Sequence, residues 1–255
     1  MINKNQLNNQ NYNKLHKLFI KILVSILSLF LLACANQEKQ FLIDDDLLAW
    51  RNNSREWKVV GEAFVDPENE NLIATKPGSG IMVNGETGKI DDIYSKKEYG
   101  DIELHVEFMI PKASNSGIYF MGRYELQIKD SWGKEKLDFH DGGTIYPRWD
   151  SNIKERGYDG YEGHLPLVDA NLAPGEWQYY DVIFRALRFD NDGNKISNAK
   201  MERVVQNGKI IHENVELTGP TRGSTYNDES SIGPIRIQGD HGHVAYRNMW
   251  LKELN

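Results

Sequence analysis

The feature that most constrains the fold of this 255-residue chain is the alternation of apolar and polar residues in several short segments. In the clearest of them, residues 101–110, one face carries Ile102, Leu104, Val106, Phe108 and Ile110, and the other carries Glu103, His105 and Glu107. Segments 124–128 and 178–184 repeat this period of two residues. Because successive side chains of a β-strand point to opposite faces, the period predicts strands that are buried on one face.

Turn signals between such segments indicate antiparallel strands. Residues 204–211 form two apolar runs around Asn207-Gly208, a pair typical of tight hairpins. Segments 234–238 and 244–251 predict the last two strands of the chain. No long segment after residue 33 has helical periodicity. The sequence therefore predicts an all-β fold, a two-sheet antiparallel sandwich. Residues 131–174 lack periodicity, and a connection of that length is typical of a functional or decorated loop.

The first 33 residues have the composition of an export signal. They contain four lysines and no acidic residue, and residues 22–33 form an apolar run that is too short to span a bilayer. The run ends in Leu31-Leu32-Ala33-Cys34, which resembles the lipobox of bacterial lipoproteins. The expected organisation is a signal peptide over 1–33, lipidation of Cys34, a polar tether over 34–41 and a single domain over 42–255. The alternative is a plain secretory signal followed by a buried core cysteine.

Charge and cysteine content argue against three classes of protein. Removal of four of the 30 basic residues and none of the 37 acidic ones leaves a net charge of −11. Such a surface disfavours nucleic acid, whose phosphates are bound by Lys and Arg. A single cysteine excludes a disulfide framework and a cysteine-rich zinc site. We expect an exported bacterial lipoprotein whose lipid anchors it to a membrane, on the periplasmic face or at the cell surface.

Polar side chains collect on the faces that do not pack inward. Opposite the apolar residues of their strands lie Glu125 and Gln127, Arg236 and Gln238, and Arg247, with Arg123 as a further neighbour. Because each sheet of a sandwich packs one face inward, these groups belong to an outer face. If that face curves, its carboxylate, amide and guanidinium groups can bind sugar hydroxyls, with Trp132, Tyr146 or Trp149 stacked on sugar rings. The alternative is an ordinary solvated face.

The long loop and one tight turn add further polar candidates. The loop contains His140, Asp141, Arg148, Trp149, Asp150, His164 and Asp169, without a spacing such as H-E-x-x-H that is typical of a metal site. In the turn Asp240-His241-Gly242-His243, His241 is a candidate general base. The alternative there is a turn in which the aspartate binds backbone amides and the histidines face solvent.

The spacing of Glu125, Gln127 and Asp130 is E-x-Q-x-x-D, where lichenase-type glucanases have E-x-D-x-x-E on a strand of a jelly-roll sandwich. A retaining glycosidase needs two carboxyl groups roughly 5–5.5 Å apart. Here the central position is an amide, which weakens an ordinary glycosidase interpretation. The sequence has no G-x-S-x-G motif, so serine-based catalysis is less favoured still.

Several motifs in order resemble the 3-keto-disaccharide hydrolase domain family. They are residues 115–120 (NSGIYF), 124–130 (YELQIKD), 175–177, 207–209, 233–242 and 246–248, and the insert 142–150 resembles one subgroup. The resemblance covers practically the whole chain from Leu42 onward. It implies a concanavalin A-like lectin/glucanase jelly roll and bacterial proteins that act on sugars oxidised at C3. A ketone at C3 acidifies the proton on C2, so that a base can remove it, the C1 substituent leaves, and water adds to the resulting enone.

On this resemblance, Glu125 and His241 are the candidate base and acid, in either order. Arg123 and Arg247 would stabilise the enolate, and the expected substrate-binding residues are Gln127, Asp130, Tyr146, Arg148, Trp149, Gln238 and Asp240. A divalent metal is the alternative electrophile, with Asp130, His140 and His241 as candidate ligands. Two other functions stay open: a cell-surface glycan-binding module without catalysis, and a conventional retaining glycoside hydrolase that uses Glu125 and Asp130.

Overall fold

The structure is a computed structural model that describes residues 38–51, 55–150, 152–153 and 160–254. All of these except Glu38 belong to one compact unit from Lys39 to Asn255. Residues 1–33 and Cys34 lie outside the described residues, so the signal peptide and the lipidation stay predictions, which the mass of the mature protein would test. No helix in the described part of the chain has the length and apolar character needed to cross a membrane.

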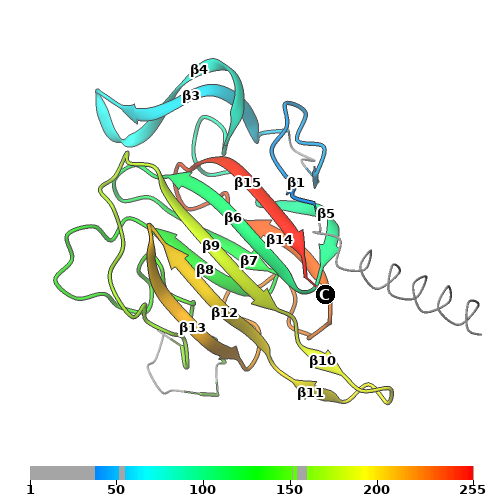
Figure 1. The fold of residues 1–255 in the computed structure, drawn as a ribbon. Coiled ribbons are helices and arrows are strands. Elements are labelled where there is room, and N and C mark those ends of the chain that lie inside the picture. Colours follow the sequence, from blue (N-terminus) through cyan, green and yellow to red (C-terminus); the bar gives the residue numbers. More distant parts are fainter. Residues whose placement is uncertain (1–37, 52–54, 151, 154–159, 255) are drawn as a thin grey trace, which may run out of the picture. The chain divides into compact units, whose positions relative to one another are not determined.

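The predicted strands pair into two antiparallel sheets that pack as a sandwich (Figure 1). The larger sheet has the order β13 (Lys209–Leu217), β12 (Ala199–Gln206), β9 (Gln178–Arg185), β6 (Ile102–Met109), β15 (Ala245–Glu253), β4 (Asn69–Val83) and β3 (Lys58–Asp66), with β1 (Gln40–Phe41) paired to β15. The smaller sheet has the order β2 (Trp50–Arg51), β5 (Ile93–Tyr99), β14 (Gly233–Ile237), β7 (Asn115–Phe120) and β8 (Tyr124–Lys129). A short hairpin of β10 (Arg188–Phe189) and β11 (Lys195–Ser197) completes the described strands.

This arrangement confirms the predicted all-β sandwich. Segments 101–110, 124–128 and 178–184 form β6, β8 and β9, and the closing segments form β14 and β15. In the β12–β13 hairpin, Asn207 and Gly208 both have positive φ angles, as a tight turn with two left-handed residues requires. The pairing of β1 with β15 shows that Gln40 and Phe41, which the sequence analysis assigned to the tether, already belong to the sheet.

The core lies between the two sheets and is built from the inward-facing residues of each strand. Along β6 the burial alternates with the predicted period, because every second side chain packs against the opposite sheet. Phe120 of β7 stacks on Phe184 of β9 with ring centroids 5.1 Å apart, so the sheets are in direct contact. Burying each such ring contributes roughly 2 kcal/mol to folding.

Strand β8 departs from the expected pattern, since nearly all of it is buried on both faces. The reason is the long loop: residues 143–148 run alongside β8, with Ile145 bridged to Leu126 on one side and to His164 on the other. The outer face of the smaller sheet is therefore not the solvated surface that strand alternation alone would give. Its polar side chains lie in a covered site.

Candidate active site

One row of side chains crosses the outer face of the smaller sheet at its centre. Antiparallel registry places Glu125 of β8 opposite Tyr119 of β7, and Tyr119 opposite Arg236 of β14. The tyrosine hydroxyl donates a hydrogen bond to the Glu125 carboxylate. The Arg236 guanidinium lies 4.0 Å from the centre of the Tyr119 ring. A carboxyl, a phenol and a guanidinium are thus held side by side by strand pairing alone.

Arg236 is fixed in place by a carboxylate and a backbone carbonyl. Its Nε donates to Oδ2 of Asp92 at 2.6 Å, its Nη2 lies 2.5 Å from the same oxygen, and its Nη1 donates to the Gly223 carbonyl at 2.6 Å. Asp92 also accepts a hydrogen bond from the backbone N–H of Gly239. The guanidinium is therefore a rigid positive group beneath the site, and the segment around Gly223 is tied to the sheet through it.

Glu125 is an unusual carboxyl for a sheet surface, because only 2% of it is exposed. Burial raises its pKa to about 8, and the nearby charges of Asp92 and Asp240 act in the same direction. The Tyr119 hydrogen bond and the Arg236 charge oppose the rise without cancelling it. A carboxyl that titrates near neutral pH can accept and return a proton within one reaction cycle.

A second row of residues lies beside the first, and its middle residue, Gly117, has no side chain. Gln127 of β8 pairs with Gly117 of β7, and Gln238 continues the row through its N–H bond to the Gly117 carbonyl. The Oε1 atoms of both glutamines, and Oδ1 of Asn115 on the same face of β7, are buried and have no hydrogen-bond partner among the residues that the structure describes. Buried amide oxygens without partners are costly, so these groups are suited to meet the hydroxyl groups of a ligand.

Gly117 gives the Glu125 carboxyl its space. A methyl group at this position would overlap with Oε1 of Glu125 and lie 3.1 Å from its Cδ, whereas the backbone of Gly117 is outside the left-handed region and would accept alanine. Gly117→Ala is therefore expected to lower stability by roughly 1–3 kcal/mol and turnover about tenfold, through displacement of Glu125.

Thermal unfolding and steady-state kinetics would measure both effects. The stability loss should vanish when Gly117→Ala is combined with Glu125→Ala, because the clash then has no partner. An equal loss in both backgrounds would contradict the proposed contact.

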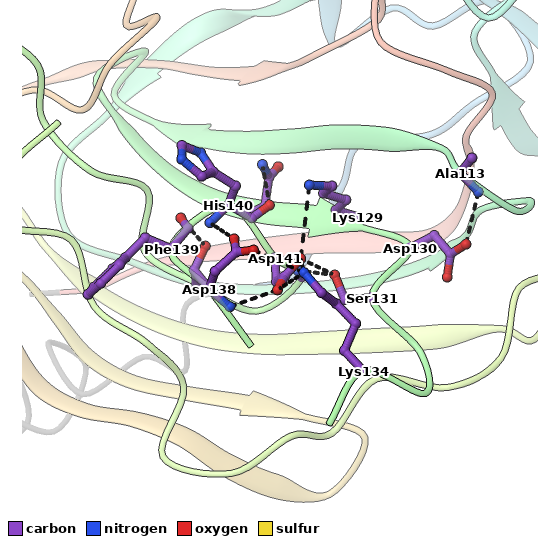
Figure 2. A network of polar contacts seen from close by, with 12 residues as sticks. Ala113, Lys129, Asp130, Ser131, Lys134, Asp138, Phe139, His140 and Asp141 are labelled. Atoms are coloured by element: carbon purple, nitrogen blue, oxygen red, sulfur yellow. Dashed lines mark hydrogen bonds and ion pairs between the residues drawn. The ribbon is translucent and has the colours of Figure 1, made fainter. Parts of the chain in front are cut away.

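The loop contributes Tyr146 and His140 to the same face. Tyr146 donates its backbone N–H to the Glu125 carbonyl at 3.0 Å, and its hydroxyl lies 2.7 Å from Nδ1 of His140. The loop is anchored through Asp141, a fully buried carboxylate on which Ser131 and Lys134 converge, as Figure 2 shows. This anchor fixes the neighbouring His140 on the rim of the site.

Arg148 and Trp149 lie in a cavity next to the central row. They line this cavity of about 440 Å³ together with the segment 220–224. Thr221 connects the cavity wall to the central row, because its hydroxyl accepts the backbone N–H of Glu125 at 3.2 Å. The expected pair Asp240 and His241 lies on the loop after β14: Nδ1 of His241 contacts Oδ1 of Asp240, and about half of each side chain is exposed.

Two expected arginines do not belong to the centre of the site. Arg247 is on β15 of the larger sheet, next to the core residue Tyr246, and faces the opposite outer surface, where it contacts Glu107 and the Trp177 ring. Arg123 lies in the turn between β7 and β8, and its guanidinium binds Asp228 and the Met121 carbonyl. The positive charge in the central row comes instead from Arg236, which is separated from Glu125 by Tyr119.

The expected metal ligands are not brought together either. Asp130 follows the end of β8 and its Oδ2 accepts the Ala113 N–H at 2.9 Å, directed away from the Asp141 cluster in Figure 2. His140 and His241 are on separate loops, at 139–141 and 240–243. Among the described residues, no three His, Cys, Asp or Glu side chains form a metal-binding group.

Sequence reasoning missed the roles of Tyr119, Gly117 and Asp92. The first two share the outer face of β7, and the alternation of NSGIYF, with Ser116, Ile118 and Phe120 facing the core, is the signal that would have found them. Asp92 precedes β5, and no pattern in the sequence connects it to Arg236, 144 residues away.

Comparison with known proteins gives the chain its relatives. A family model described as the 3-keto-alpha-glucoside-1,2-lyase-like domain matches residues 39–252. A crystal structure of a candidate glycosyl hydrolase from Parabacteroides distasonis is 26% identical, covers 85% of this chain and 84% of its own, and superposes with a TM-score of 0.60. A second candidate glycosyl hydrolase from that organism is 16% identical, with coverage of 85% and 100% and a TM-score of 0.54, which shows a shared fold. None of the curated proteins compared with the chain matches it.

Proposed function

Because the chain belongs to the family of the 3-keto-alpha-glucoside-1,2-lyase-like domain, we propose that it cleaves 3-keto-glycosides by elimination at C1 followed by hydration. Membership of this family and the likeness to a candidate glycosyl hydrolase associate the chain with glycoside cleavage. The observation that carries the finer proposal is Glu125: a buried carboxyl with a pKa of about 8 at the centre of the polar face.

The chemistry follows from the acidity of the substrate. The C3 ketone acidifies the C2 proton, and the Glu125 carboxylate removes it as a general base. Such a base works best when its pKa is close to the operating pH, and burial brings this carboxyl there. The negative charge moves to the C3 oxygen, where Arg236 contributes a positive field. The Oε1 atoms of Gln127 and Gln238 are acceptors and are suited to bind the hydroxyl groups of the sugar. The bond from C1 to the leaving oxygen then breaks.

The geometry favours this reaction over a conventional retaining mechanism. Asp130, the second carboxyl of the E-x-Q-x-x-D spacing, comes five residues after Glu125 along an extended strand, which is roughly 16 Å. Two carboxyl groups roughly 5–5.5 Å apart would be needed for double displacement. Between them stands Gln127, an amide that cannot serve as a nucleophile. Glycan binding without catalysis also gives no reason to bury an ionisable carboxyl.

The test is a comparison of two substrates on the purified mature domain. Aglycone release should occur from a 3-keto-glucoside and not from its unoxidised parent, because only the ketone acidifies C2. Loss of release with EDTA would add a divalent metal to the mechanism. Release from the unoxidised parent would instead support a conventional hydrolase. Binding of either sugar without release would support a glycan-binding module.

A further inference from the structure

Tyr146, in the loop segment 143–148 that pairs with β8, lies next to the proposed base Glu125. Residues 143–148 pair with β8, and the bridge from Ile145 to Leu126 places Ile145 in the core. Its neighbour Tyr146 therefore faces the other way, onto the face that carries Glu125. The N–H of Tyr146 bonds the Glu125 carbonyl at 3.0 Å, so the two residues are directly opposed. Side chains opposed in this way begin about 5 Å apart at Cβ.

The Tyr146 hydroxyl is paired with a histidine that is held from two sides. Nδ1 of His140 lies 2.7 Å from the hydroxyl, and the two rings meet edge to face at 5.1 Å. The backbone N–H of His140 donates to Oδ1 of Asp138 at 2.8 Å. The backbone carbonyl of His140 accepts a hydrogen bond from the side-chain amide of Gln127 at 3.3 Å. The histidine is thus bound both to its own loop and to the second polar row of the site.

Elimination requires a second proton-transfer group, because the leaving oxygen must be protonated as C2 is deprotonated. His241, the residue expected for this role from the sequence, has a half-exposed side chain that contacts the neighbouring Asp240. Tyr146 is instead partly buried and lies directly across from the base. A phenol is a far stronger acid than an alkyl alcohol, so a tyrosine hydroxyl is suited to protonate the oxygen that leaves.

We propose that Tyr146, paired with His140, is the acid that protonates the departing oxygen. This inference rests on the proposed elimination mechanism and deepens it. In the first step Glu125 takes the C2 proton, the C1–O bond breaks, and the Tyr146 hydroxyl gives its proton to the leaving oxygen. His140 positions the hydroxyl and stabilises the phenolate that remains.

In the second step water adds to the enone and restores both residues. The water oxygen bonds C1, one water proton returns to the Tyr146 oxygen, and Glu125 returns its proton to C2. The sum is one glycoside and one water converted to the free 3-keto sugar and the alcohol. No oxidant, reductant or further reactant is needed.

Tyr146→Phe tests the assignment when it is assayed on two 3-keto-glucosides that differ in leaving group. An alkyl alcohol needs protonation as it leaves, whereas 4-nitrophenol does not. We expect kcat for the alkyl glucoside to fall by about a hundredfold or more, with KM little changed, and kcat for the nitrophenyl glucoside to change by only a few-fold. Tyr179→Phe is the matched control, because Tyr179 packs near His105 on the outer face of the larger sheet and should leave both rates unchanged.

His140→Gln is the second variant, and thermal unfolding confirms that each variant folds. It should give an intermediate loss, again confined to the alkyl substrate, because the tyrosine stays but loses its partner. Equal losses on both substrates would overturn the acid role and assign Tyr146 to binding or to structure. Unchanged rates would overturn it as well. Wild-type protein that releases neither aglycone would overturn the proposed function itself, which separates the two failures.

Discussion

Replacement of Glu125 by glutamine is expected to reduce aglycone release from a 3-keto-glucoside by about a hundredfold or more while the protein stays folded. The amide has the size and shape of the carboxyl and can still accept the hydrogen bond from Tyr119, but it cannot remove a proton. Binding should survive, because Gln127, Gln238 and Arg236 are unchanged. Steady-state kinetics and calorimetric titration with the 3-keto-glucoside measure the two properties separately.

Glu107→Gln provides the matched control for this experiment. Glu107 is also a strand glutamate with polar partners, Arg247 and Asn248, but it lies on β6 in the other sheet. Its substitution should leave turnover close to wild type. Near wild-type turnover in Glu125→Gln would remove Glu125 from the mechanism, and loss of substrate binding in that variant would assign it to recognition.

Strand alternation was sufficient to predict the sandwich because the burial of each strand is decided locally. In β6 and β9 each residue faces either the core or the outer face, so the period of two is visible in the sequence. The long ribbon of β3 and β4 escaped prediction for the same reason. Most of its side chains are exposed or half-buried on both faces, and its strands approach closely where Gly61 meets Gly78. Neither feature leaves a periodic signal.

The site was predictable only where the alternation of odd and even residues between the two faces of a strand was enough. Alternation placed Glu125, Gln127 and Gln238 on one face, and the structure brings these three together. This alternation shows which face of its strand a residue occupies but not which sheet the strand joins. Arg247 was wrongly grouped with these residues because β15 pairs with β6 and β4 in the larger sheet. The position of Tyr146 depends on an irregular loop strand pairing with β8, for which no local pattern exists.

The pH dependence of stability gives a second large effect that requires no substrate. The native pKa of Glu125, about 8, is above its ordinary value of 4.5, so the native state keeps the proton after the unfolded state has lost it. The stabilisation is fully present below pH 4.5 and is lost as the pH rises through 8, at about 1.4 kcal/mol per unit. His212 acts in the opposite sense up to pH 6.5, because burial lowers its pKa to about 4. Burial also lowers the pKa values of His164 and His243.

Because the histidines act in the opposite sense to Glu125 between pH 4.5 and 6.5, the decisive window is above pH 6.5. There the three histidines whose pKa burial lowers, His164, His212 and His243, are neutral in the native state and lose their remaining charge in the unfolded state as the pH rises, so the decline comes mainly from Glu125. We expect the free energy of unfolding to fall by roughly 2 kcal/mol between pH 6.5 and 8.5, or roughly 4–8 °C in Tm for a domain of this size. Denaturant unfolding of wild type and Glu125→Gln across this range measures it.

The variant should lose this decline altogether, since an amide has no proton to give up, and should be more stable than wild type at pH 8.5. Glu107→Gln should keep the wild-type slope: the pKa of Glu107 is lowered by its Asn248 and Arg247 partners, despite burial, so its contribution changes only in acid. A decline that persists in Glu125→Gln would show that another buried group titrates near 8 and that Glu125 is ionised in the native protein. That result would count against the raised pKa of Glu125 on which both the stability prediction and the catalytic role depend. A carboxyl that is ionised throughout the neutral pH range has an ordinary pKa and is a weaker base for the C2 proton.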